Sequence, residues 1–200
     1  MKYNEMKQAV NLLAEEWNLG KKESEAEGNI CAWIYLIDLL EESEKIVTYK
    51  DGKKLVGFCG YSNKSSHRRL IKRKIYKTIG NILRKSKKIK DKEGFNQYEN
   101  NYDYVPKELE NYFDGEVSIL IVDKNYRGQK IGKKILLEVF KMAKKDNMKN
   151  LQILTDESCN YHFYEKCGCQ KIYETMIENT EYGKLEKITA EKAFIYEKIL

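Results

Sequence analysis

The sequence of 200 residues predicts an α/β fold in which helices flank a mixed, mostly antiparallel sheet that contains one parallel β-α-β pair. Three features support this prediction. Two helical segments precede a β-hairpin, a long apolar strand is joined to a second strand through a helix, and two more strands follow. Because a dozen or more helical residues join the middle two strands, these strands should run parallel through a right-handed crossover.

The first half of the chain begins with helices and a hairpin. Residues 1–45 read as two helices with a polar joint, and the second helix is apolar around most of its surface, which predicts burial. The strand segments 45–50 and 53–61 flank Asp51 and Gly52. This pattern favours a hairpin closed by a tight Asp-Gly turn.

Regular elements return in the second half of the chain. The nearly continuous apolar run 117–122 is typical of a strand covered on both faces. A helix is expected over about 130–145, and a strand is expected at 151–155. The remaining elements are a short helix that ends at Gly168 and two final strands, over residues 159–166, 170–178 and 193–200.

Between these halves we expect a helical insertion at about 62–112 within one domain that covers residues 1–200. Its first part, Lys64 to Lys90, contains twelve Lys or Arg and no Asp or Glu. Apolar residues recur there at helical spacing: Ile71, Ile75, Ile79 and Leu83. This predicts a basic amphipathic helix whose apolar face covers the core and whose basic face is solvated. The second part, 91–116, is acidic and rich in tyrosine.

Composition narrows the class of protein. No run of about 18 apolar residues occurs, so no transmembrane helix is expected. The first residues mix both charges and lack the apolar core of a signal peptide, which predicts a cytoplasmic protein. The net charge of +6 hints at an anionic ligand. An odd number of cysteines predicts free thiols rather than a disulfide framework: Cys31, Cys59, Cys159, Cys167 and Cys169.

One local rule is broken at the start of the helix over about 130–145. Lys130, Lys133 and Lys134 surround Gly132, although a helix N-terminus carries positive partial charge and disfavours cations. A strand, a glycine-containing loop and a helix N-terminus together form an anion-binding device, in which the lysines would lie beside phosphates. The spacing of Gly128 and Gly132 fits neither a dinucleotide fingerprint nor a P-loop.

This loop resembles the pyrophosphate loop of the GNAT superfamily, the acetyl-CoA-dependent N-acetyltransferases. Arg127, Ile131 and Gly132 match its pattern, Gly128 is often seen beside the arginine, and Lys130 replaces the middle glycine. A second stretch, CNYHFYEKCGC, resembles the tyrosine-containing helix of the same superfamily, with Cys169 in place of the usual aromatic residue. The matching positions of that stretch are Asn160, Phe163, Tyr164, Glu165, Lys166 and Gly168.

The resemblance implies a GNAT fold and an enzyme that moves the acetyl group of acetyl-CoA to a primary amine, with no metal. It implies that the backbone of the first parallel strand pairs with the pantetheine and that the loop holds the pyrophosphate. It also implies that Tyr164 acts as general acid, while Glu116 is our choice for the base, with Asp156, Glu157 or ordered water as alternatives. The implied cofactor-binding residues are Leu120, Ile121, Val122, Arg127, Gly128, Gln129, Lys130, Ile131, Gly132, Lys133, Asn160 and Tyr164.

Several alternatives stay open at this level. Cys159, His162, Cys167 and Cys169 could form a zinc site, although their spacing is unlike a zinc knuckle. The acceptor could be a small molecule or a peptide or protein, and the acidic stretch Glu99 to Glu116 would suit a cationic amine under a lid formed by the insertion. Competing hypotheses are a basic module that docks on nucleic acid or an anionic membrane, and an acetyl-CoA sensor without turnover. The oligomeric state is not predicted.

Overall fold

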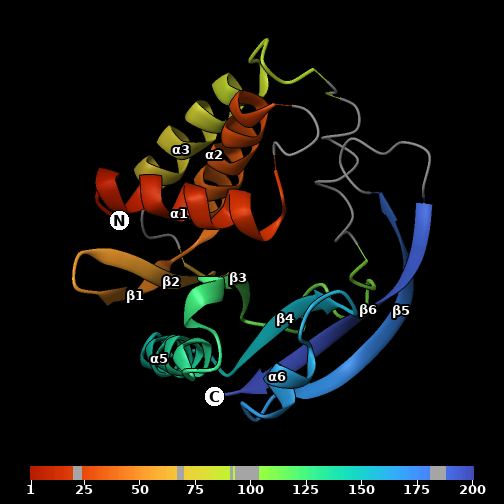
Figure 1. Cartoon of the computed structure of the whole chain (residues 1–200). Helices are drawn as coiled ribbons and strands as arrows, with labels where there is room; N and C mark the ends of the chain where they lie inside the picture. The colour runs from red at the N-terminus through yellow and green to blue at the C-terminus, as the bar shows by residue number, and fades with distance from the viewer. Residues whose placement is uncertain (20–23, 67–69, 91, 93–103, 181–187) are drawn as a thin grey trace.

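The computed structural model describes residues 1–19, 24–66, 70–90, 92, 104–180 and 188–200. These residues form one mixed sheet with the strand order β1-β2-β3-β4-β6-β5, in which only β3 and β4 pair in parallel (Figure 1). The strands are β1 (Lys45–Asp51), β2 (Lys54–Tyr61), β3 (Gly115–Val122), β4 (Asn150–Asp156), β5 (Gln170–Thr180) and β6 (Ile188–Ile199). The predicted mixed sheet with one parallel β-α-β pair is therefore confirmed.

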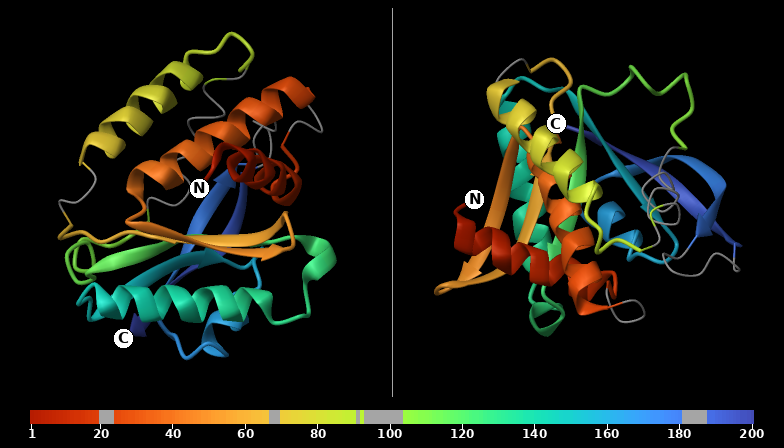
Figure 2. Two further views of the ribbon diagram at one scale, coloured as in Figure 1. Left: turned by 90° about the vertical axis from the view of Figure 1, so that its left-hand side faces the viewer. Right: turned by 90° about the horizontal axis from the view of Figure 1, so that it is seen from above.

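Helices cover both faces of this sheet. On one face lie α5 and the short α6, and on the other lie α1 and α2, with α3 outermost beyond α2 (Figures 1 and 2). Each face has its own apolar core, the first formed between the sheet and α5 and the second between the sheet and α1 and α2. The helices are α1 (Tyr3–Glu16), α2 (Glu25–Glu42), α3 (Leu70–Arg84), α5 (Ile131–Lys145) and α6 (His162–Glu165).

The hairpin between β1 and β2 forms as expected, but its turn lies one residue further along. Asp51 still belongs to β1 and pairs with Lys54, so Gly52 and Lys53 are the central turn residues. Gly52 has a φ of 56°, as a hairpin turn with glycine in first position requires. The Asp51 carboxylate instead accepts a hydrogen bond from the Tyr126 hydroxyl at 2.9 Å.

A bulge in β3 changes the pairing register between β2 and β3 at the centre of the sheet. Tyr61 of β2 faces Val117 and Cys59 faces Leu120, so β3 uses three residue steps where β2 uses two. Val117, Leu120 and Val122 consequently belong to the core under α5, whereas Ile119 and Ile121 belong to the opposite core. A bulge bends a strand and increases its twist.

At the same place β3 separates from β4. Their parallel pairing covers only Gly115 to Val117 of β3, opposite Leu151 to Ile153 of β4, although β3 continues to Val122 and β4 continues to Asp156. Beyond the bulge, β3 pairs with β2 alone and β4 pairs with β6 alone. The carboxyl ends of the two central strands are therefore not paired with each other, and this separation is here named the slot.

The inserted helix α3 packs with a different face from the one that the sequence predicted. Tyr76 and Leu83 pack into the core formed with α2, and the buried Gly80 lets α3 lie close to that helix. The predicted apolar face was wrong for its isoleucines, because Ile71, Ile75 and Ile79 are 76%, 52% and 37% exposed. Arg84 fixes this orientation through hydrogen bonds of 3.2 and 2.6 Å to the two carboxylate oxygens of Asp38 on α2.

Candidate active site

The start of α5 presents free backbone amides beside the slot. The first hydrogen bond of this helix joins Lys134 N–H to the Lys130 carbonyl at 3.0 Å, so the amides of residues 131–133 have no acceptor within the helix. Lys130 is the N-cap residue, and its side chain makes no capping hydrogen bond. The first turn contains no acidic residue. Uncapped amides, the helix dipole and three lysines together suit an anion with several oxygens.

Lys130 adopts the left-handed conformation, with φ 60° and ψ 16°. A side chain in this region costs about 1–2 kcal/mol, and glycine avoids that cost. The conformation explains why the resembling motif has glycine at this position. Lys130 therefore keeps the backbone shape of the loop at an energetic cost and adds a charge.

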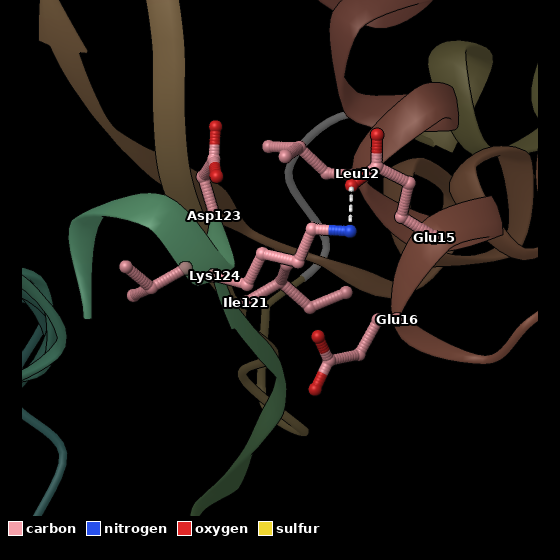
Figure 3. Close-up of a pocket in the computed structure, with 7 residues that line it drawn as sticks. Leu12, Glu15, Glu16, Ile121, Asp123 and Lys124 are labelled. Carbon is pink, nitrogen blue, oxygen red and sulfur yellow. Dashed lines mark ion pairs between the residues drawn. The ribbon is translucent and has the colours of Figure 1, made fainter.

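Arg127, three residues before Lys130, contacts helix α1. Its guanidinium forms an ion pair with Glu16 and its Nε donates to the Val122 carbonyl at 3.3 Å. Lys124 lies 3.5 Å from Glu15, and these groups border a small cavity of about 20 Å³ at the end of β3 (Figure 3). The loop is thus held against the C-terminal end of α1 by two ion pairs.

The second sequence motif lies beside the first. A Cβ atom on Gly132 would meet the ring of Phe163 at 3.5 Å, which is ordinary contact, and Lys133 Nζ donates to the Lys166 carbonyl at 3.4 Å. The turn before α6 is closed by the Asn160 carbonyl, which accepts from Phe163 N–H at 3.0 Å. The two motifs are therefore parts of one surface at the start of α5.

Tyr164 packs into the core under α5, with its ring centroid 5.8 Å from that of Tyr196. Burial, followed by the nearby thiols of Cys59, Cys159, Cys169 and Cys167, raises the pKa of Tyr164. The phenol therefore stays protonated throughout the neutral range and can act as a proton donor.

An acidic cleft lies on the opposite face of the sheet. Its volume is about 360 Å³, and it is lined by residues from α2, α3, β3 and the segment after β2: Glu41, Glu42, Ser62, Asn63, Arg73, Glu116 and Ser118. Glu116 Oε2 accepts from Gln152 Nε2 at 2.7 Å. Burial raises the pKa of Glu116, while the hydrogen bond from Gln152 and the charge of Lys64 act against this rise.

Glu42 lies at the mouth of this cleft, at the C-terminal end of α2. Loss of hydration beside the surrounding protein raises the pKa of Glu42 to about 7, and the negative charges of Glu116, Asp38 and Glu41 act in the same direction. The positive charge of Arg73 acts against them. Part of the Glu42 side chain is exposed to solvent, so the repulsion from these neighbouring carboxylates supports the upward direction of the pKa shift independently of burial.

Sequence reasoning found Glu116 but missed the partners that α2 supplies. Glu41 and Glu42 end an α-helix that has no basic residue in its last turn. Acidic residues at a helix C-terminus are unfavourable, for the same reason that lysines at an N-terminus are unfavourable. The rule that drew attention to Lys130 would therefore have identified Glu41 and Glu42.

The other sequence candidates are not brought into this cleft. Asp156 is buried and accepts from the backbone and hydroxyl of Ser158, which closes its own turn. Glu108 and Glu110 are exposed, whereas Glu99 and Asp103 lie outside the described residues.

The segment that returns from the insertion is held at the carboxyl end of β4. The Tyr104 hydroxyl accepts from Thr155 N–H at 3.1 Å and lies 3.1 Å from the carbonyls of Thr155 and Phe194.

The zinc alternative finds no support in the described residues, which hold no group of three or more His, Cys, Asp or Glu arranged for a metal ion. His162 is exposed and contacts Glu165 at 3.1 Å, whereas Cys167 and Cys169 are buried in the core. Among the described helices, none has both the length and the apolar character that a membrane crossing needs.

Comparison with known proteins finds one protein family that matches part of this chain. Residues 93–171 match the family described as the acetyltransferase (GNAT) domain. This match covers part of the chain and agrees with the two motifs at the start of α5. It indicates an acyltransferase of the GNAT kind. No curated protein matches the chain.

Solved structures share the fold of this GNAT domain at low identity. An aminoglycoside 6'-N-acetyltransferase complexed with coenzyme A is 13% identical, with a TM-score of 0.59, over 99% of this chain and 92% of the other. A GNAT-family acetyltransferase from Streptococcus pneumoniae is 12% identical, with a TM-score of 0.56, over 100% and 96%. The aminoglycoside 6'-acetyltransferase type Ii is 15% identical, with a TM-score of 0.56, over 97% and 88%. The GNAT fold is therefore confirmed over nearly the whole chain.

Replacing Lys130 by glycine should raise the free energy of unfolding by up to about 1 kcal/mol, because glycine removes the left-handed strain but adds flexibility to the unfolded chain. The matched control is Lys133→Gly, inside the first turn of α5, which should lower it by about 0.5–1 kcal/mol. Urea denaturation measures both variants. If both variants changed the free energy of unfolding in the same direction, the backbone strain at Lys130 would be contradicted.

Replacing Glu42 by glutamine should raise the melting temperature at pH 8 and leave it unchanged at pH 4. The folded pKa of about 7 exceeds the usual 4.5, so the stability that protonated Glu42 contributes at low pH is lost as pH rises from about 4.5 through 7. Glu138→Gln on α5 is the control, since it makes the same chemical change on the other face of the sheet. An equal effect of Glu42→Gln at both pH values would contradict the raised pKa.

Proposed function

We propose that this GNAT domain transfers the acetyl group of acetyl-CoA directly to a primary amine while both are bound. The observation that carries the proposal is the slot between β3 and β4, which opens beside the uncapped start of α5. Acetyl-CoA supplies the acetyl group as an activated thioester with a diphosphate to hold it. The coenzyme A in the aminoglycoside 6'-N-acetyltransferase structure supports the same choice of cofactor.

The residues around the slot suit the parts of acetyl-CoA. Amides from Gly128 to Lys133, with Arg127 and the lysines, would hold the diphosphate, as helix N-termini do. The unpaired edge of β3 from Leu120 to Val122 would bind the pantetheine amides as an added strand does, and an amide there would stabilise the carbonyl oxygen as it becomes negative. Asn160 and Tyr164 would complete the site from the side of α6.

Proton transfer would use both faces of the sheet. Tyr164 lies under α5 and keeps its proton at neutral pH, so it can give that proton to the departing sulfur. Glu116 lies in the cleft on the opposite face, where a water relay can carry the amine proton to its carboxylate. The slot is the place where the two faces meet.

The cleft also favours a class of acceptor. Three glutamates line it, and Gln152 Oε1, buried beside Glu116, has no hydrogen-bond donor among the described residues. Carboxylates in a partly dry cleft bind ammonium groups through charge-assisted hydrogen bonds. We therefore propose an acceptor that carries a second positive charge besides the reacting amine.

For the transfer itself, acetyl-CoA should raise the melting temperature of both the wild type and Tyr164→Phe, whereas NAD should raise neither. Release of free CoA thiol to the best amine of a screen should fall at least about 100-fold in Tyr164→Phe, because its general acid is lost. Tyr161→Phe, on the same segment, is the matched control and should keep its rate. Unchanged turnover in Tyr164→Phe would exclude the acid role, and no shift with acetyl-CoA would exclude the cofactor.

For the acceptor, Glu42→Gln should raise the KM for spermidine about tenfold and leave the KM for propylamine nearly unchanged, because only spermidine offers a second ammonium group. The control is again Glu138→Gln. Equal effects on both amines would contradict the acceptor class while leaving acetyl transfer intact.

A further inference from the structure

The outer face of α3 combines an exposed apolar row with positive charge. Its apolar row, here named the isoleucine stripe, consists of Ile71, Ile75, Ile79 and Ile82, which are 76%, 52%, 37% and 65% exposed. This spacing places all four on one side of a helix with 3.6 residues per turn. A different side of α3 packs on α2 through Tyr76, Gly80 and Leu83, so α2 does not cover the stripe. Helix α3 lies outermost, beyond α2 (Figure 2).

Lysines border the stripe on both sides. Lys72 follows the first isoleucine on one flank, Lys74 precedes the second on the other, and both are exposed. Within the described ranges, neither lysine forms an ion pair with a carboxylate. The following segment adds the exposed Lys85, Lys87, Lys88 and Lys90. Thr78 within the stripe bonds its hydroxyl to the Lys74 carbonyl at 2.9 Å, which satisfies that polar group internally.

Three kinds of partner could cover such a face, and the charges distinguish them. Nucleic acid would bind the lysines through phosphates but would leave the isoleucines without a role. A second copy related by two-fold symmetry would bring the same lysine-flanked patch against itself. An anionic lipid surface accepts both features, because isoleucines enter the acyl boundary while the flanking lysines reach phosphate headgroups.

We propose that α3 docks the protein on an anionic membrane surface, with the isoleucine stripe inserted at the headgroup boundary and Lys72 and Lys74 on lipid phosphates. The helix has 15 residues and lies parallel to the surface rather than across the bilayer. Docking needs no unfolding, because the stripe is already exposed in the folded protein. Arg73 on the same helix lines the acidic cleft, so a docked α3 holds that cleft about one helix diameter from the lipid.

The test is co-sedimentation of the full chain with vesicles of phosphatidylcholine that contain about one third phosphatidylglycerol, compared with phosphatidylcholine alone. The wild type should bind only the anionic vesicles. The double variant Ile71→Ser with Ile75→Ser should bind about 100-fold more weakly, about tenfold for each isoleucine. Its melting temperature should stay unchanged, since both side chains are exposed. Leu137→Ser, at a similarly exposed position on α5, should bind like the wild type.

Charge is tested by Lys72→Gln with Lys74→Gln against the control pair Lys141→Gln with Lys144→Gln on α5. Only the first pair should weaken vesicle binding, and added salt should weaken the binding of the wild type. The proposal would be overturned if the wild type did not bind anionic vesicles. It would also be overturned if the isoleucine variants still bound them and short duplex DNA competed for this binding. A third contrary result would be a dimer in sedimentation velocity that the isoleucine variants abolish.

Discussion

The separation of β3 from β4 is the constraint on which the candidate site depends. A single bulge between Val117 and Leu120 ends the parallel pairing and turns the rest of β3 toward β2 alone. Because β4 stays paired with β6, neither strand can close the opening from its own side. The slot is therefore built into the register of the sheet, and the loop that follows β3 brings the start of α5 beside it.

Two helix ends give this slot its electrostatic character. The N-terminus of α5 carries lysines and the C-terminus of α2 carries Glu41 and Glu42, so each end has the charge that its own dipole disfavours. The two ends lie on opposite faces of the sheet. An anionic ligand is thus favoured on one face and a cationic ligand on the other. Both helix ends therefore carry a charge that destabilises them locally. Each lies where a ligand of the opposite charge would bind, as is common at functional sites.

Much of the fold and of the anion-binding loop could be predicted from the sequence, because strong local patterns determine them. The continuous apolar run of β3 and the helix that follows it fixed the parallel pair, and two motifs in order gave the family. The face of α3 was mispredicted because isoleucine periodicity shows that a helix is amphipathic but does not show what covers its apolar side. Gly80 and the Arg84–Asp38 contact decided the packing instead. The slot depends on a one-residue difference between strands, which no local pattern reveals.

That one-residue difference has a consequence for how such proteins diverge. In a regular strand, side chains alternate between the faces, so one extra residue exchanges the faces for everything that follows. Here Val117 and Leu120 nevertheless share a core, because the bulge absorbs the extra residue. Substitutions in β3 that keep Val117 and Ile121 apolar and leave Gly115 in place preserve this register, whereas loss of one residue between Val117 and Leu120 would remove the extra residue of the bulge. The slot therefore depends on the number of residues in β3 as well as on the identity of their side chains.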